Sequence, residues 1–312
     1  MKATSLLFFS SSPLSLPLLE VLLKDERFVL VGLVCQPDKA AGRSGELLAP
    51  ATKALALEHG IPVYQPEKLS KDAALLETLK KDPPDFLLTF AYGQLLSEDW
   101  LKLPRREALN LHPSLLPKYR GPTPPQAALL HGEKETGITL MRMVKEMDAG
   151  PIARQHPFAL GEITTGELFE EVAKRAAEWI PEDLALIAAQ EDFAFVEQDA
   201  SLATYCEKFT KEDTFEDFKK AAEVVMNRYR AFTPWPGLWT TFKGKRLKFL
   251  ALDSSERKAS PGTVLVDGGC LFVGTQTEAV KILTLQMEGK SALSAAEFLR
   301  GHPNFTNAVL PS

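Results

Sequence analysis

The sequence predicts an α/β protein in which a mostly parallel sheet covered by helices is followed by a small β-barrel. Two observations support this fold class. In the first half of the 312-residue chain, short apolar runs alternate with stretches of helical periodicity, which is the pattern of a parallel sheet with crossover helices. In the last third, short apolar runs follow one another closely and glycines separate them. That pattern is typical of a small barrel or sandwich, and an OB-like barrel fits the length.

The elements of the first half follow from the spacing of apolar residues. The runs 5–9 and 28–35 are expected as strands, and the stretch 17–24 between them has helical periodicity. A helix is also expected over 51–59, where Gly60 provides a favoured stop. Further strands are expected at 86–90, 108–111 and 139–144.

A long helical stretch, 165–190, closes the first half, and Pro181 is expected to kink or break it. A polar stretch without periodicity follows. We therefore expect a first domain over 1–189, a linker over 190–206 and a C-terminal domain over 207–312. In the C-terminal domain, a helix is expected at 214–227 and strands at 238–242, 246–250, 263–266, 270–273 and 280–286.

The composition excludes several classes of protein. With 45% hydrophobic and 25% charged residues, the chain is neither disordered nor collagen-like. Its three cysteines lie far apart and its five histidines show no ligand spacing, so we expect core thiols and no metal. No apolar run reaches the ~20 residues of a membrane span, and the apolar run near the N-terminus suits a strand better than a signal peptide. We expect a cytoplasmic monomer.

Charge is distributed unevenly along the chain. Residues 1–205 hold 21 Lys and Arg against 29 Asp and Glu, whereas 206–312 hold 15 against 12, within a net charge of −5. The stretch 224–252 has no acidic residue but six basic ones. Such a stretch indicates contact with a polyanion, although a solvated basic face would have the same composition.

The segment 108–152 carries the candidate chemistry. Asn110 and His112 stand at positions i and i+2 of an expected strand end, so their side chains project to the same side. Ligands of open α/β sheets bind at the carboxyl ends of strands. Asp148 follows a strand-like run and is a candidate to orient the imidazole. From spacing alone, a structural role for Asn110 and His112 at a strand end is favoured over a catalytic one.

These residue types suit acyl transfer. An imidazole moves protons to and from amines near neutral pH, and an Asn amide can donate to the oxyanion of a tetrahedral intermediate. A carboxylate beside the imidazole stabilises its cation, so Asp148 is expected to raise the pKa of His112. The nucleophile motif G-x-S-x-G is absent. Direct transfer to a substrate amine therefore fits better than a covalent enzyme intermediate.

The segments NLHPSLLPKYRG and TGITLMRMVKEMDAGPI closely resemble the folate-dependent formyltransferases. The family's Asn-x-His and distal Asp correspond to Asn110, His112 and Asp148. Stretches beginning VGLVCQPDK, LATYCEKFTKED and RAFTPWPG extend the resemblance over nearly the whole chain. They point to the branch that formylates methionyl-tRNA. The resemblance implies a Rossmann-like catalytic domain with helices on both faces of the sheet and an OB-like C-terminal domain.

The resemblance also implies the substrates and their contacts. The formyl donor is expected to be 10-formyltetrahydrofolate and the acceptor the α-amino group of methionyl-initiator tRNA, with cationic His112 and Asn110 stabilising the oxyanion. Expected folate-binding residues are Ser114, Leu115, Leu116 and Pro117, with Tyr92 and Gly93 on the pterin side. Expected tRNA-binding cations are Lys39, Arg43, Arg228, Arg230, Lys243, Lys245, Arg246 and Lys248.

Two segments depart from the family pattern. The first strand commonly opens into Gly-Thr-Pro-x-Phe-Ala, where this chain has 10–15, SSSPLS. The loop after the second strand is commonly Lys-rich, but here only Lys39 and Arg43 supply positive charge and Glu46 adds a carboxylate. Fewer phosphate contacts would weaken tRNA binding.

Two other functions remain open at this point. An amino sugar nucleotide could be the acceptor with the same donor and the same catalytic residues. Alternatively, the chain could be a nucleic-acid-binding protein whose α/β part has lost activity. The basic stretch 224–252 favours the tRNA acceptor over the sugar nucleotide, and the intact Asn110, His112 and Asp148 favour an enzyme.

Overall fold

The computed structural model describes residues 3–41 and 46–311 of the chain. They form two compact units, each made of three segments that are not consecutive in the sequence. The first unit comprises Met1–Pro124, Thr136–Phe158 and Phe169–Cys206, and the second comprises Pro125–Glu135, Ala159–Leu168 and Glu207–Ser312. The linear division 1–189, 190–206 and 207–312 stays a prediction.

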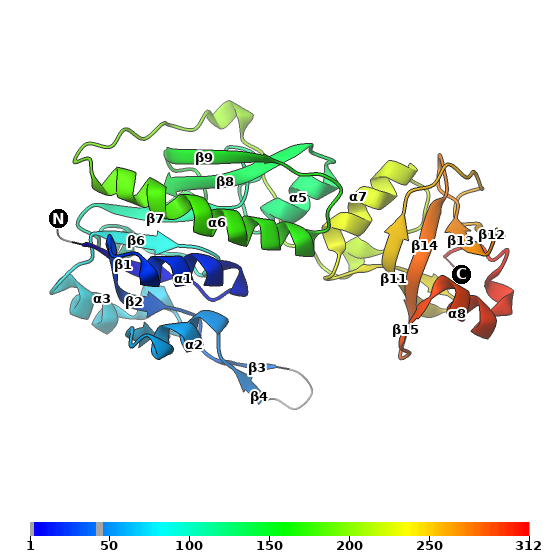
Figure 1. Ribbon diagram of the computed structural model, residues 1–312, viewed down its shortest axis with the longest axis horizontal. Helices are drawn as coiled ribbons and strands as arrows, with labels where there is room; N and C mark the ends of the chain where they lie inside the picture. Colours follow the sequence, from blue (N-terminus) through cyan, green and yellow to red (C-terminus); the bar gives the residue numbers. More distant parts are fainter. Residues whose placement is uncertain (1–2, 42–45, 312) are drawn as a thin grey trace. The chain divides into compact units, whose positions relative to one another are not determined.

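The first unit is built on a seven-stranded sheet of order β5-β2-β1-β6-β7-β8-β9 (Figure 1). The strands from β5 to β7 are parallel, and β8 runs antiparallel to β7. The mostly parallel sheet predicted from the sequence is therefore confirmed. The strands are β1 (Thr4–Phe9), β2 (Phe28–Val34), β5 (Val63–Tyr64), β6 (Phe86–Thr89), β7 (Glu107–His112), β8 (Glu135–Arg142) and β9 (Ile152–Ala159).

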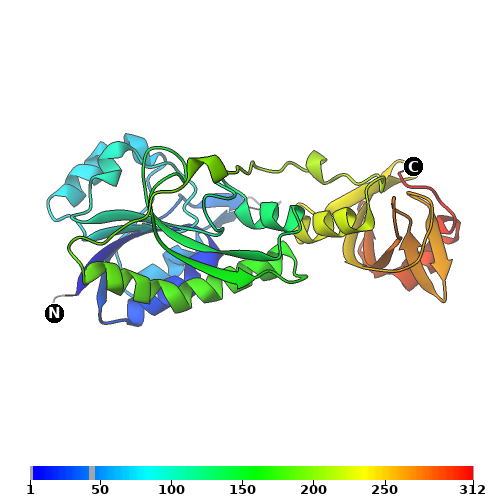
Figure 2. The ribbon, with the colours of Figure 1, turned by 90° about the horizontal axis from the view of Figure 1, so that it is seen from above.

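Helices cover both faces of this sheet, with α6 on one side and α3 on the other (Figure 2). Leu7, Phe9 and Leu87 join a buried cluster with Leu76 of α3 and Trp100 of α4. Because side chains alternate along a strand, the intervening apolar residues face the opposite layer. The helices of this unit are α1 (Leu16–Lys24), α2 (Ala51–Glu58), α3 (Ala73–Lys80), α4 (Glu98–Leu101) and most of α6 (Thr165–Ala188).

Helix α6 continues through Pro181, so of the predicted kink or break at this proline, the break is wrong. Apolar packing explains the continuity. Buried residues line one face of α6 on both sides of the proline, and Arg106 donates to the carbonyl oxygens of Ile187 and Ala188 at the C-terminal end. The packing offsets the backbone hydrogen bond that a proline cannot form. The buried face is made by Leu168, Val172, Ala176, Ile180, Leu184 and Ile187.

The strand order reverses between β1 and β6. From β1 the chain builds β2 and β5 on one side and then returns to place β6 and β7 on the other. In open α/β sheets such a reversal leaves a crevice at the carboxyl ends of the flanking strands. The candidate residues that end β6 and β7 therefore lie next to the expected ligand position.

The second unit contains an antiparallel sheet of order β10-β11-β14-β13-β12, with β15 paired to β14. Register shifts in β11 around Ala251 act as bulges, which increase twist and let a sheet curl. The OB-like C-terminal prediction is thereby confirmed. The strands are β10 (Leu238–Phe242), β11 (Lys245–Asp253), β12 (Val264–Asp267), β13 (Cys270–Val273), β14 (Val280–Met287) and β15 (Ala292–Ser294).

Three helices complete the second unit: α5 (Pro124–Leu130), α7 (Ala222–Phe232) and α8 (Ala295–Gly301). The predicted helix at 214–227 is wrong in its bounds. Residues 215–221 are not helical. Phe215 forms a β-bridge with Trp239, and the buried Glu216 carboxylate accepts a hydrogen bond from the backbone amide of Phe218. Within the described residues, no helix is long and apolar enough to cross a membrane.

Candidate active site

The structure brings Asn110, His112 and Asp148 together. Asn110 and His112 lie on β7, two residues apart, and Asp148 lies in the loop between β8 and β9. The Nδ1 atom of His112 is 3.7 Å from Oδ2 of Asp148. This distance is longer than a hydrogen bond, but it places the carboxylate where it stabilises a proton on Nδ1.

His112 is held by its other ring nitrogen. Nε2 lies 2.9 Å from the carbonyl oxygen of Tyr119. Because a carbonyl only accepts, Nε2 carries the proton in the neutral ring, and Nδ1 presents its lone pair toward Asp148. The basic nitrogen of this histidine is therefore the one beside the carboxylate.

The pKa of His112 is lowered from its usual value. Burial is the main cause, and it outweighs the opposing effects of Asp148 and of the Tyr119 carbonyl. The side chain is 5% exposed. Asp148 acts in the expected direction, but desolvation of the ring dominates, so the pKa of His112 is lowered overall. A neutral imidazole is suited to accept a proton.

Two hydrogen bonds hold Asp148, and a third holds the loop beside it. Its Oδ2 accepts the backbone amide of Gly121 at 2.8 Å, and its carbonyl accepts Nε2 of Gln198 at 2.9 Å. Gln198 also donates to the carbonyl of Gly150 at 2.7 Å. Asp148 has a φ of +52°, a conformation that Asp tolerates better than most residues. Sequence reasoning missed Gln198, since no motif connects it with the loop that it holds.

Asn110 and Asp148 line a cavity of about 530 Å³ at the carboxyl ends of β6 and β7. Apolar side chains supply much of its wall, and Glu98 and Lys145, 3.5 Å apart, lie at its edge. This volume is within the roughly 300–1,000 Å³ of small-molecule sites. The wall also includes Thr89, Tyr92, Gly93, Leu95, Leu96, Met141, Met143 and Met147.

Tyr92 and Gly93 border this cavity, and their contact with the pterin stays a prediction. The Tyr92 ring is nevertheless 4% exposed and packs against Phe9 with centroids 5.3 Å apart. Burial raises the pKa of the Tyr92 hydroxyl above its usual range. The Tyr92 carbonyl accepts Nε2 of Gln36 at 3.2 Å, which positions the loop. The backbone and Gly93, more than the phenol, are what a ligand would meet.

The stretch Ser114–Pro117 forms a tight turn beside β8 and is not among the described residues lining the cavity. Thr139 donates to the Ser114 carbonyl at 2.6 Å and accepts the Leu116 amide at 3.2 Å. Gln155 donates to the Leu116 carbonyl at 2.7 Å. The structure thus gives this stretch a structural role, and its contact with folate stays a prediction.

The candidate tRNA-binding cations differ in their availability. Arg228 donates to the fully buried Glu216 at 2.6 Å, and Arg230 donates to Asn227 at 2.7 Å. Both guanidinium groups are therefore engaged within the second unit. Lys39 at the start of β3 (Lys39–Ala41) is exposed, as are Lys243 and Lys245, whereas Lys248 is half-buried and Arg246 lies over the Trp239 ring. Arg43 lies outside the described residues.

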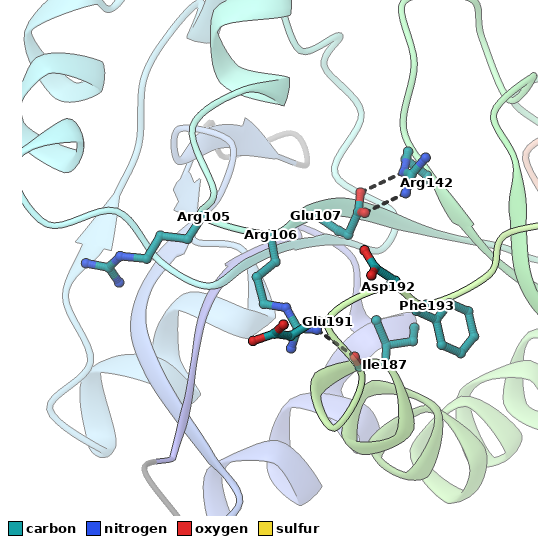
Figure 3. A pocket seen from close by; sticks show the side chains of 8 residues that line it. All are labelled: Arg105, Arg106, Glu107, Arg142, Ile187, Glu191, Asp192 and Phe193. Atoms are coloured by element: carbon teal, nitrogen blue, oxygen red, sulfur yellow. Dashed lines mark hydrogen bonds and ion pairs between the residues drawn. The ribbon is translucent and has the colours of Figure 1, made fainter.

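A second cavity, of about 380 Å³, lies near the C-terminal end of α6 (Figure 3). Its arginines are also engaged. Arg142 makes two hydrogen bonds to Glu107, at 2.6 and 2.7 Å, and Arg106 caps α6. Arg105 points away in Figure 3 and pairs with Asp82. Arg142 thus ties β8 to β7, and Arg106 ties the start of β7 to the end of α6.

The turn after β1 departs from the family pattern but is well packed. Ser10 and Ser15 are buried and share a short hydrogen bond, and the hydroxyl of Ser12 caps the amide of Leu14. Thr52 donates to the Ser10 carbonyl at 3.0 Å. Serine hydroxyls thus supply the local hydrogen bonds of this turn.

A carboxamide and a carboxylate line a small-molecule cavity on a mostly parallel sheet, and an imidazole lies 3.7 Å from the carboxylate. The comparisons give the class of protein to which this arrangement belongs. The formyl transferase model matches residues 5–184, and the model of the formyl transferase C-terminal domain matches residues 208–303. The chain belongs to the formyl transferase family.

Relatives and solved structures agree with this membership. The chain is 41% identical to the methionyl-tRNA formyltransferase of Thermotoga neapolitana over 87% of each sequence. It is 38% identical to that of Acidobacterium capsulatum over 95% of this chain and 96% of the relative. The fold resembles the N-formyltransferase of Helicobacter canadensis solved with folinic acid and dTDP-3-aminofucose. That match has a TM-score of 0.68 and 16% identity, and covers 91% of this chain and 99% of that structure.

Proposed function

We propose that this chain transfers a formyl group from 10-formyltetrahydrofolate to the α-amino group of methionyl-initiator tRNA. The observation that carries the proposal is that Asn110 and Asp148 line one cavity and that the imidazole of His112 lies 3.7 Å from the Asp148 carboxylate. This geometry occurs in a chain 41% identical to a methionyl-tRNA formyltransferase over 87% of its length.

The cavity suits the donor. Its apolar wall, which includes Leu96, Met141 and Met143, matches a flat heteroaromatic ring. The exposed Gly93 leaves room for close approach of a ring to the backbone. Asn110 and Asp148 bring polar groups to the same cavity, where the formyl group has to react.

In the proposed reaction the amino nitrogen attacks the formyl carbon, so a C–N bond forms and the carbon becomes tetrahedral. The amide of Asn110 donates to the oxyanion. Neutral His112 takes the proton that the attacking nitrogen loses, and Asp148 stabilises the resulting imidazolium. The bond to N10 then breaks, and the proton passes from His112 to N10. The oxyanion collapses to the new formamide.

The acceptor end of the proposal rests on charge. Lys243 and Lys245 are exposed in a stretch that lacks acidic residues, and such residues favour a phosphate backbone. The likeness to the sugar-modifying structure is at 16% identity, and it supports the fold alone. A tRNA acceptor therefore remains the better match for the basic stretch 224–252.

Replacing the catalytic residues tests the mechanism. Asn110→Ala and Asp148→Ala should each lower kcat for formylation of methionyl-tRNA by about 10²–10⁴, since each removes stabilisation of the transition state. Steady-state kinetics with purified variants would measure the loss, and circular dichroism would confirm that the fold is intact. Variants that fold normally and keep near-normal kcat would contradict the assignment.

A further inference from the structure

Thr89 is the last residue of β6, and Asn110 is its partner in the neighbouring strand β7. The Thr89 side chain is buried, with 3% of its surface exposed. Its hydroxyl oxygen lies 2.6 Å from Oδ1 of Asn110, compared with 3.2 Å from the Leu109 carbonyl and 3.4 Å from the sulfur of Met143. The shortest of these contacts joins Thr89 to the proposed oxyanion donor.

The chemistry of the groups around the Thr89 hydroxyl determines which of them receives its proton. A hydroxyl has one proton to donate, and the Leu109 carbonyl and the Met143 sulfur are both acceptors. The closest acceptor, Oδ1 of Asn110, receives the proton. The other end of the carboxamide, Nδ2, then makes no hydrogen bond to any described residue and remains available to a ligand in the cavity that Asn110 lines.

We propose that Thr89 is a positioning residue that fixes the orientation of the Asn110 carboxamide, so that its N–H faces the developing oxyanion. The two ends of a carboxamide have nearly the same shape, and only their hydrogen bonds distinguish them. Without the Thr89 proton, a rotated Asn110 would present its carbonyl to a negative oxygen. This inference rests on the proposed function, because it concerns the same transition state.

Thr89→Val tests the proposal, because valine keeps the β-branched shape and removes the proton. Loss of one neutral hydrogen bond should lower kcat by about 3- to 10-fold. The KM values for folate and tRNA should stay within about twofold, since the lost interaction acts mainly on the transition state. Thr89→Ser restores a hydroxyl at the same position and should recover most of kcat.

Two controls separate positioning from a structural effect. Thr240→Val makes the same change at another fully buried strand threonine, whose hydroxyl has no partner among the described residues, and it should leave kcat unchanged. In the Asn110→Ala background, Thr89→Val should cause little further loss, because the group that Thr89 orients is gone.

Three results would overturn the assignment of Thr89: an unchanged kcat in Thr89→Val, no recovery in Thr89→Ser, or a full additional loss in the Asn110→Ala background. The activity of the wild-type chain distinguishes a failure of the proposed function from a failure of the positioning role of Thr89. If it fails to formylate methionyl-tRNA, the proposed function is wrong. If it is active and Thr89→Val is equally active, only the positioning role is wrong.

Discussion

His112 shows how burial and charge compete at a single residue. The carboxylate of Asp148 favours the charged ring, but the loss of solvent disfavours it more, so the net effect on the pKa is downward. Proton uptake is then coupled to the reaction itself. In the proposed reaction, the carboxylate would stabilise the imidazolium at the moment when the attacking amine releases its proton.

The pH dependence of kcat/KM should report this balance. Activity needs both a neutral substrate amine and neutral His112, so the acid limb contains two pKa values, and the one that belongs to His112 should lie below the usual histidine value of about 6.5. Asp148→Asn removes an effect that raises this pKa. The limb should therefore move to still lower pH in the variant, on top of the drop in rate. A limb that moves to higher pH in Asp148→Asn would contradict the proposed pairing.

At the scale of single residues, the sequence predicted those site residues whose spacing along a strand or place after a strand could be recognised. Asn110 and His112 could be placed together because two positions on one strand share a side. Asp148 was a candidate from its place after a strand-like run, and it also matched the family's distal Asp. Thr89 and Gln198 were not found, although they contact Asn110 and the Asp148 loop. Their roles come from strand pairing and from a return of the chain fifty residues later, neither of which leaves a local pattern.

At the scale of elements, Arg228 belongs to the packing of α7. Its guanidinium pairs with the fully buried Glu216 and also donates to the carbonyls of Asp213 and Phe215. The positive charge that suggested tRNA contact is thus neutralised inside the second unit. Net charge along a sequence does not show which cations are already paired.

Arg228 and Lys245 should respond differently to substitution. Arg228→Ala leaves the Glu216 carboxylate buried without its partner, which typically costs about 3–5 kcal/mol, so the thermal unfolding midpoint should fall. Lys245→Glu changes an exposed side chain and should leave the midpoint unchanged while raising KM for tRNA. That increase should shrink as salt rises. The reverse assignment of effects would contradict this reading of the two residues.

Element boundaries were predictable where apolar periodicity was clean. The strands around β1, β2 and β6 and helix α1 appear within two residues of their expected bounds. The continuous α6 and the late start of α7 at Ala222 were not predicted. In both, packing outweighs local preference: the apolar face of α6 spans Pro181, and Glu216 holds the chain before α7 in a non-helical form.

At the scale of the whole molecule, the units do not follow the chain order. The segments 125–135 and 159–168 group with the C-terminal residues. Thr165 donates to the carbonyl of Ala231 at 2.7 Å, and a Cβ at Gly132 would lie 2.8 Å from Asn227. A reading of the sequence places boundaries between consecutive segments, so it could not detect this exchange.

The central claim, formyl transfer to methionyl-initiator tRNA, is tested most directly by identifying the molecule that receives the formyl group. The purified chain would be incubated with 10-formyltetrahydrofolate labelled in the formyl group, together with methionyl-initiator tRNA and an amino sugar nucleotide in the same reaction. Folded Asn110→Ala and Asp148→Ala variants would run in parallel as matched controls. The account predicts that label accumulates on methionyl-tRNA and that both variants transfer it far more slowly. Label on the sugar nucleotide instead, or no transfer to either acceptor, would contradict it.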